Sequence, residues 1–271
     1  MTKLSDKTIW ITGASSGIGE QLSYQLAGKG NRLILSSRRK EELARVKKNC
    51  PPSAQMDIHI VPLDLADPNS LDKAAESALS IYGSVDVLVN NGGISQRSLA
   101  VETRFEVDQR ILNVNFLSAV KLTKLVLPGM IKNNDGHIVV TSSLVGKFGT
   151  PFRSSYAASK HALHGFFDAL RAEVWENNIF VTLFCGGYIK TNISMNAVKG
   201  DGSPQNKMDE NQAKGKSAAD ATRAMIKAIE SNKQEVYFGG KEIMGVYLKR
   251  FFPSLLYRVV RKMKINQVEE A

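Results

Sequence analysis

The sequence predicts an α/β fold in a single domain, with a doubly wound parallel sheet of seven strands and helices on both faces. Short apolar runs alternate with longer stretches of helical periodicity, and this alternation is typical of a parallel sheet. The chain has 271 residues, which suffices for one large core, and its 43% apolar and 23% charged residues are typical of a globular protein. The strands are expected at 8–12, 32–37, 58–63, 85–89, 137–141, 179–184 and 234–238.

Helical patterns separate these strands, with apolar residues three and four positions apart. The helices are expected over 22–27, 41–49, from 67 onward, 105–127, 155–171 and 218–229. We take residues 1–240 as the catalytic domain and 241–271 as a C-terminal extension. Within the domain, residues 192–217 are polar and rich in glycine, which predicts a mobile lid over the site.

A glycine-rich turn follows the first strand directly and leads into the first helix. Its residues are Gly13, Ala14, Ser15, Ser16, Gly17, Ile18 and Gly19. Glycine lets backbone N–H groups approach a pyrophosphate, which then lies at the positive N-terminus of the helix. The turn therefore predicts a dinucleotide site, although a glycine motif alone also fits an ordinary turn.

The second strand ends in Ser37, Arg38 and Arg39, where a sheet of this kind meets the adenosine ribose of a dinucleotide. An acidic residue there would bind the 2′-hydroxyl of NAD, and none is present. Two arginines can hold a 2′-phosphate by charge-assisted hydrogen bonds, so we predict NADP(H). The alternative is that the arginines only begin the next helix in solvent.

Polar residues and glycines follow the other strands as well. Ligands of parallel sheets bind beyond the carboxyl ends of the strands, so these residues are expected to converge on one side. Asp64 either accepts from the adenine amino group or caps the helix that begins near 67, and both interpretations stay open. The residues at these strand ends are Asp64, Leu65, Asn91, Gly92, Gly93, Ser143, Ile189 and Thr191.

Two helical stretches carry residues that suggest chemistry. Asn115 lies inside 105–127, and asparagine is a poor helix-interior residue, so it indicates either a site or a hydrogen-bonded core position. Tyr156 and Lys160 lie four residues apart on 155–171, on one face and one turn from each other. A positive charge favours the phenolate, so we expect Lys160 to lower the pKa of Tyr156 from its ordinary ~10.

Together these motifs resemble the short-chain dehydrogenase/reductase family over about the first 240 residues. The resemblance is specific because several short motifs match jointly in order and spacing. Gly92 stands where the family mostly has Ala, and Gly186 where it mostly has Pro. The matching positions are 12–19, 90–93, Asn115, Ser143, Tyr156, Lys160 and 187–191.

The resemblance implies a three-layer Rossmann fold and an oxidoreductase that interconverts a carbonyl and a secondary alcohol by hydride transfer. It implies that Tyr156 donates the proton and that Lys160 lowers the pKa of Tyr156 and holds the nicotinamide ribose. Ser143 would bind the carbonyl oxygen of the substrate, and Asn115 would hold a water that relays protons. Two alternatives are a ketoacyl reductase of lipid synthesis and a scaffold that binds NADP without turnover.

A closer likeness, to the 7B-type dehydrogenase/reductase subgroup related to hydroxysteroid dehydrogenases, runs through 152–161, 187–192, 200–203 and 208–209. Animal members of that subgroup carry an N-terminal membrane anchor. The segment 1–7 is short and polar, so we do not expect the membrane topology of those members to apply to this chain. No uninterrupted apolar stretch reaches membrane-spanning length. We expect a homodimer or homotetramer in the cytoplasm, where Cys50 and Cys185 stay reduced.

The C-terminal extension holds most of the excess positive charge. The net charge is +10, and residues 241–264 contain seven basic residues and one acid. No basic stripe or recognised module precedes this segment, so no nucleic acid is expected as a partner. Its apolar residues and Pro253 predict two short helices that either lie on a membrane surface or pack on the substrate pocket or a partner subunit. Either arrangement indicates a lipophilic substrate.

Two histidines, His161 and His164, lie one turn apart on the same predicted helix as Tyr156. A metal site needs three or four ligands, and no carboxylate–histidine signature accompanies this pair. We therefore expect no metal.

Overall fold

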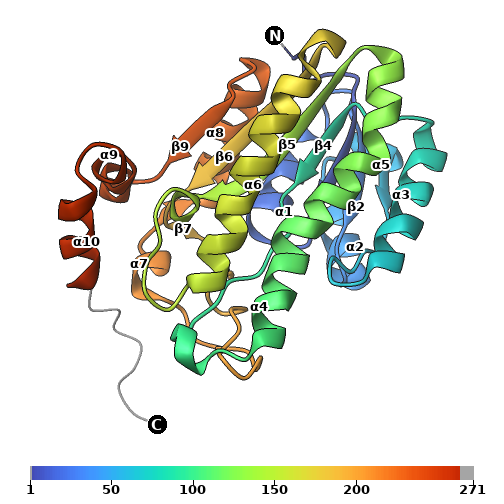
Figure 1. Ribbon diagram of the computed structural model, residues 1–271. Helices are drawn as coiled ribbons and strands as arrows, with labels where there is room; N and C mark the ends of the chain where they lie inside the picture. Colours follow the sequence, from blue (N-terminus) through green and yellow to red (C-terminus); the bar gives the residue numbers. More distant parts are fainter. Residues whose placement is uncertain (1, 263–271) are drawn as a thin grey trace.

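The computed structural model describes residues 2–262 and confirms the predicted sheet (Figure 1). Seven parallel strands lie in the order β3-β2-β1-β4-β5-β6-β9, so β1 pairs with β2 on one side and with β4 on the other. A ligand crevice is expected at this point, where the strand order reverses. The strands are β1 Thr8–Thr12, β2 Arg32–Ser36, β3 Ile58–Ile60, β4 Val87–Asn90, β5 Gly136–Ser143, β6 Ile179–Gly186 and β9 Glu235–Phe238.

Helices cover both faces of the sheet, and each face has its own apolar core. On β1, Ile9 and Ile11 point to one core and Trp10 to the other, because side chains alternate along a strand. Helices α1 (Gly17–Leu26), α2 (Lys40–Asn49) and α8 (Ala218–Glu230) cover the first face. The second is covered by α3 (Pro68–Tyr82), α5 (Ser118–Asn133) and α6 (Ser154–Glu173).

Shorter elements complete the chain. The remaining α-helices are α4 (Phe105–Leu112), α7 (Glu210–Ala213), α9 (Met244–Phe251) and α10 (Pro253–Arg261). Strands β7 (Ile189–Lys190) and β8 (Lys216–Ser217) form a separate two-stranded sheet. The 3-10 turns are Pro52–Asp57, Ala100–Glu102, Leu144–Gly146, Trp175–Asn177 and Lys241–Ile243.

The bounds of several predicted elements shift by a few residues, and the third strand and the helix expected over 105–127 differ in a further way. The third strand is regular only to Ile60 instead of 63, although the Val61 and Leu63 N–H groups still donate to the Leu35 and Ser37 carbonyls at 3.0 Å. The helix expected over 105–127 is divided by a π-helical turn at Asn113–Leu117 and then continues to Asn133. This combined stretch, Phe105–Asn133, is the one described helix whose length and composition would suffice to cross a membrane, which the sequence interpretation did not expect. Here it packs against the sheet, α3 and α6.

The lid predicted over 192–217 contains α7 and is tied to the body by backbone hydrogen bonds. Val198 donates to the Ser95 carbonyl at 2.9 Å, and Arg104 donates to the Gly200 carbonyl at the same distance. At its end, β8 pairs with β7 in parallel. The lid therefore has a defined position beside the carboxyl ends of the strands.

Truncating a side chain in one of the two cores should lower the stability of the protein. Leu183 of β6 is fully buried, so Leu183→Ala should lower the free energy of unfolding by about 2–5 kcal/mol, through lost burial and the cavity left behind. Urea unfolding followed by circular dichroism measures the change. Val101→Ala is the matched control because Val101 is 91% exposed, and an equal loss in both variants would contradict the assignment of the core.

Candidate active site

One cavity of about 840 Å³ lies at the carboxyl ends of the strands and collects nearly all of the predicted site residues. Gly19 and Asn115 do not line it but contact residues that do. The predicted residues that line the cavity are Gly13, Ser15, Ser16, Gly17, Ile18, Ser37, Arg38, Arg39, Asp64, Leu65, Asn91, Gly92, Gly93, Ser143, Tyr156, Lys160, Ile189 and Thr191.

The glycine turn leaves no room for side chains at two positions. Gly13 has φ +65°, and a Cβ atom there would lie 2.8 Å from the Gly92 Cα. A Cβ atom at Gly19 would lie 2.3 Å from the Gly13 carbonyl oxygen. Ser16, the N-cap of α1, makes no side-chain capping bond, so the N–H groups of the first turn are open to a ligand in the cavity.

The Thr12 hydroxyl holds this turn to the end of β4, a contact that the sequence interpretation missed. It accepts from the backbone N–H groups of Asn91 at 3.0 Å and Gly92 at 3.1 Å, and it donates to the Val89 carbonyl at 3.2 Å. The Asn91 amide in turn donates to the Thr12 carbonyl at 3.1 Å. Thr12 is the last residue of an apolar strand, so its sequence position carried no separate signal.

The end of β2 presents two exposed arginines to the cavity. Arg39 donates to the Ser15 hydroxyl at 3.3 Å, which ties it to the glycine turn. Asp64, at the end of the neighbouring strand, does not cap α3: its carboxylate accepts from the Ala66 N–H, and Asp67 is the N-cap, accepting from Asn69. The capping alternative for Asp64 is therefore wrong.

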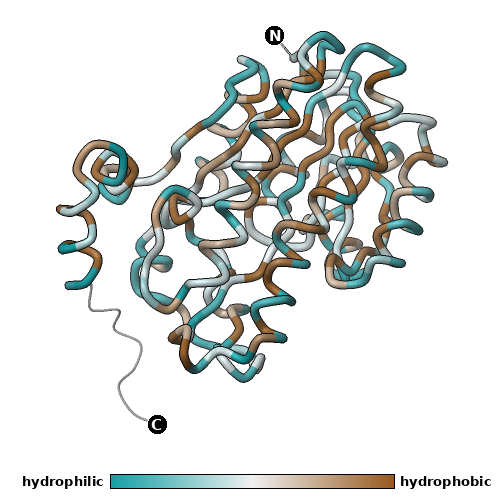
Figure 2. The backbone as a smooth tube through the Cα atoms, viewed as in Figure 1, coloured by the Kyte–Doolittle hydropathy of each residue, from teal (hydrophilic) through white to brown (hydrophobic). Residues whose placement is uncertain are grey.

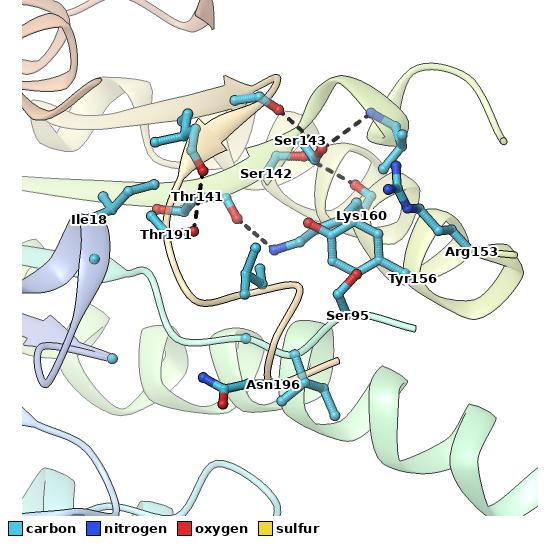
Figure 3. A pocket seen from close by; sticks show the side chains of 18 of the residues that line it. Ile18, Ser95, Thr141, Ser142, Ser143, Arg153, Tyr156, Lys160, Thr191 and Asn196 are labelled. Carbon is cyan, nitrogen blue, oxygen red and sulfur yellow. Dashed lines mark hydrogen bonds between the residues drawn. The ribbon is translucent and has the colours of Figure 1, made fainter. Parts of the chain in front are cut away.

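Tyr156 and Lys160 are both buried on α6 and lie on the side that faces the end of β5 (Figure 3). The Lys160 ammonium lies 5.7 Å from the centre of the Tyr156 ring and donates to the Thr141 carbonyl at 2.8 Å. Ser143, two residues further along β5, donates to the Gly186 carbonyl at 3.1 Å. The predicted pair on α6 and the predicted serine therefore share one end of the cavity.

The pKa of Tyr156 is raised, which is opposite to the prediction. Burial is the largest cause, because it disfavours the charged phenolate. The Ser143 hydroxyl and the charges of Arg153 and Arg97 act in the other direction but do not overcome it. Burial also lowers the pKa of Lys160 to about 8, so its ability to stabilise an adjacent phenolate is weakened near that pH.

Asn115 lies in the π turn, where its side chain links three segments. Its Oδ1 atom accepts from the Ile94 N–H at 2.8 Å, and its Nδ2 group donates to the Ile94 carbonyl and, at 3.0 Å, to the Ser159 hydroxyl. A π turn widens the helix and is frequent at functional sites. Asn115 is thus a fully bonded residue that joins the β4 loop to α6.

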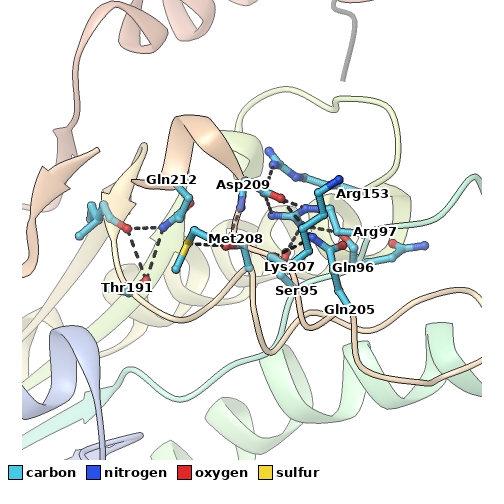
Figure 4. Close-up of polar contacts among 12 residues, drawn as sticks. Ser95, Gln96, Arg97, Arg153, Thr191, Gln205, Lys207, Met208, Asp209 and Gln212 are labelled. Atoms are coloured by element: carbon cyan, nitrogen blue, oxygen red, sulfur yellow. Dashed lines mark hydrogen bonds and ion pairs between the residues drawn. The ribbon is translucent and has the colours of Figure 1, made fainter. Parts of the chain in front are cut away.

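Two arginines near Tyr156 bind an aspartate of the lid, an arrangement that the sequence interpretation did not foresee (Figure 4). Asp209 forms ion pairs with Arg97 and, at 3.2 Å, with Arg153. The Arg97 and Asp209 side chains are only 5% and 6% exposed. Burial and the Arg153 charge both lower the pKa of Arg97. The lid is therefore held to the site by a buried ion pair.

Behind the site, His164, Cys185 and Glu235 bring three groups of metal-ligating type within 4.8 Å of one another. Glu235 is already paired with Lys147 at 2.9 Å, and the His164 Nε2 atom lies 3.0 Å from the Ser142 hydroxyl. Burial lowers the pKa of His164 to about 4, so it is neutral at pH 7. Cys185 Sγ lies 3.8 Å from Glu235 Oε1, and His164 Nδ1 is buried without a hydrogen-bond partner in the described part of the chain. That no metal binds here stays a prediction.

Comparison with known proteins identifies the family. Residues 7–202 match the family model described as short chain dehydrogenase. The chain is 44% identical over 264 residues to a "Dehydrogenase/reductase SDR family protein 7-like" of Anopheles gambiae, which covers 96% of this chain and 83% of the relative. It is 40% identical over 261 residues to "Dehydrogenase/reductase SDR family member 7B" of Mus musculus, which covers 95% and 81%.

A solved structure shares the fold along the whole chain. It is a short-chain dehydrogenase/reductase from Burkholderia phymatum in complex with NAD, with a TM-score of 0.81 and 21% identity over 100% of this chain and 99% of that one. The chain therefore belongs to the short-chain dehydrogenase/reductase family, and this membership makes it an oxidoreductase. The predicted likeness to its 7B members is confirmed.

The buried ammonium makes stability depend on pH. Lys160 has a pKa of about 8 in the folded chain against 10.5 for an ordinary lysine, so between these values the unfolded chain binds a proton that the folded chain lacks. Stability should therefore rise with pH from about 8 to about 10.5 through this residue. In Lys160→Met that part of the slope should disappear in urea titrations at several pH values. Lys48→Met, at an exposed lysine, should keep it, and equal slopes in both variants would contradict the burial effect.

Proposed function

We propose that this oxidoreductase uses NADP(H) and reduces a carbonyl, or oxidises the matching secondary alcohol, on a lipophilic substrate. The observation that carries the proposal is the position of Tyr156 and Lys160 in one cavity, between the glycine turn and an apolar wall. All four residues predicted to act in catalysis are present and lie in or against that cavity, which favours turnover over a binding scaffold.

The cofactor end of the cavity fits a phosphorylated dinucleotide. The open N-terminus of α1 can accept a pyrophosphate, and side chains on the glycines would fill that space. Arg38 and Arg39 supply two positive charges where the adenosine ribose would lie, and no acidic residue occupies 37–40. These features support NADP over NAD.

When bound, the nicotinamide supplies or accepts the hydride, and the residues of the chain handle the proton. Because burial raises the pKa of Tyr156, its hydroxyl keeps its proton at neutral pH and can give it to a carbonyl oxygen that is gaining negative charge. In the reverse direction, Tyr156 must first be a phenolate, whose oxygen then takes the proton of the alcohol.

The side chains around Tyr156 can assist the reaction both when Tyr156 is a protonated phenol and when it is a phenolate. The single Ser143 proton, which goes to the Gly186 carbonyl here, would turn to the substrate oxygen and add a hydrogen bond beside that of Tyr156. Arg97 and Arg153 favour the phenolate, so they stabilise Tyr156 after it has given up its proton. Asn115 holds the β4 loop and α6 together beneath the site, and a water near it would return a proton towards Lys160.

The opposite wall of the cavity is apolar and comes from two parts of the chain. One part follows β5 and the other lies in the C-terminal helices, so a hydrophobic substrate would lie between them. The apolar residues of this wall are Leu144, Val145, Phe148, Met244, Leu248, Leu256 and Val259.

Removing the phenol tests the proton donor. Tyr156→Phe should lower kcat by about 10²–10⁴-fold because no other side chain replaces the proton donor. NADPH oxidation with carbonyl lipids, steroids and small polar ketones measures turnover, and quenching of protein fluorescence by NADPH shows that cofactor binding is kept. Tyr82→Phe is the control because Tyr82 lies on α3, away from the cavity. Near-normal turnover in Tyr156→Phe would remove the assignment, and turnover of polar ketones alone would contradict a lipophilic substrate.

Changing the arginine at the end of β2 tests the cofactor. Arg38→Ala should raise KM for NADPH on the order of tenfold or more, because a charge-assisted bond to the 2′-phosphate is lost, and should change KM for NADH little. Initial rates with each cofactor give both values. Lys48→Ala, an exposed cation on α2, should change neither, and equal effects of Arg38→Ala on both cofactors would mean that the choice of NADP is wrong.

A further inference from the structure

The C-terminal helices α9 and α10 carry a concentrated apolar surface that nothing in the described chain covers. Between residues 2 and 262, fourteen large apolar side chains are exposed. Seven of them lie in 244–259, which is a small part of that range. A patch of this kind marks an interaction surface, whereas scattered exposed residues do not. Its members, here called the helical patch, are Met244, Tyr247, Phe251, Phe252, Leu255, Tyr257 and Val259.

The inner side of the same helices is already used. Val246 and Leu256 are buried against Leu144 and Phe148, beside the substrate cavity. The inner side of the C-terminal helices therefore packs on the pocket, as one of the two predicted arrangements requires. The outer side of these helices does not take part in that packing. Of the nine residues of α10, Leu256 is the one that is buried, so the outer side needs a separate explanation.

Basic residues surround the helical patch. Lys249, Arg250, Arg258, Arg261 and Lys262 lie on these two helices or directly after them (Figure 2 shows the alternation of apolar and polar residues). The one acid of the segment, Glu242, accepts from the Tyr188 N–H at 3.0 Å and so faces the body of the protein. The exposed charge beside the patch is therefore positive.

We propose that the helical patch docks on a membrane surface that contains anionic lipids, with α9 and α10 lying in the headgroup region. Apolar side chains would enter the acyl boundary while the basic residues contact lipid phosphates and carboxylates, as in interfacial amphipathic helices. A second copy of the chain is the less favoured occupant, because a two-fold contact would bring the basic residues of both copies together. Figure 1 shows the two helices projecting beyond β9, free of the helices that cover the sheet.

This surface adjoins the entrance of the cavity. Met244 and Val259 belong to the helical patch and also line the cavity. A lipophilic substrate dissolved in the membrane would then reach Tyr156 without crossing water. This part of the inference rests on the proposed function, whereas docking itself needs neither cofactor nor substrate.

Vesicle flotation of the full chain, without cofactor, tests the docking. Binding should be stronger to vesicles of phosphatidylcholine mixed with phosphatidylserine than to phosphatidylcholine alone, and added salt should weaken it. Arg250→Glu with Arg258→Glu should reduce binding to the anionic vesicles by at least about fivefold per residue. Phe251→Ser with Phe252→Ser should reduce binding to both kinds of vesicle. Trp175→Ser and Lys48→Glu, exposed positions elsewhere, are the matched controls and should bind like the unchanged chain.

The outcomes separate docking from catalysis. The two double variants and the two control variants should unfold at the same temperature as the unchanged chain, and all should turn over a water-soluble ketone normally. Phe251→Ser with Phe252→Ser should raise KM for a ketone dissolved in vesicles. Tyr156→Phe should lose turnover and still float. An unchanged chain that does not float, or patch variants that float equally well, would overturn the proposal. A fall in oligomer mass in the phenylalanine variant, measured by light scattering and without any flotation, would assign the patch to self-association instead.

Discussion

The hydrogen bond from the Lys160 ammonium to the Thr141 carbonyl joins the two elements that carry the proposed chemistry, α6 and β5. A buried ammonium needs such an acceptor, because an unpaired charge away from water is costly. The bond sets which side of α6 faces the strand end, and Tyr156, one turn earlier, is oriented with it. Ser143 lies two residues beyond Thr141 on the same strand, so one contact aligns three side chains.

Burial disfavours the charged form of both members of this pair, so it shifts their pKa values in opposite directions. It holds Tyr156 protonated and makes the charge of Lys160 easier to lose. The positive charges that favour the phenolate come from Arg97 and Arg153, and Asp209 of the lid partly neutralises them. The phenol therefore lies near a cluster of two positive charges and one negative charge, and the negative charge comes from the lid.

The cavity has two chemically different ends. Open N–H groups and arginines line the end beside β1 and β2. Apolar side chains from the 3-10 turn at Leu144–Gly146 and from the C-terminal helices line the other end. The reacting groups lie between them, at the end of β5. This division follows from the parallel sheet, which brings the carboxyl ends of the strands to one side, and from the extension beyond β9, whose helices pack against Leu144 and Phe148.

The features that could be predicted from the sequence are local ones. Alternating apolar runs, the turn from Gly13 to Gly19 and the four-residue spacing of Tyr156 and Lys160 each follow from short-range periodicity or sterics, and the parallel sheet then brings the strand ends together. The pairing of Arg97 with Asp209 joins residues 112 positions apart, which no local pattern reveals. The pKa of Tyr156 was predicted in the wrong direction for the same reason: spacing shows a neighbouring charge, but the loss of water around the phenol depends on how α6, β5 and the lid pack.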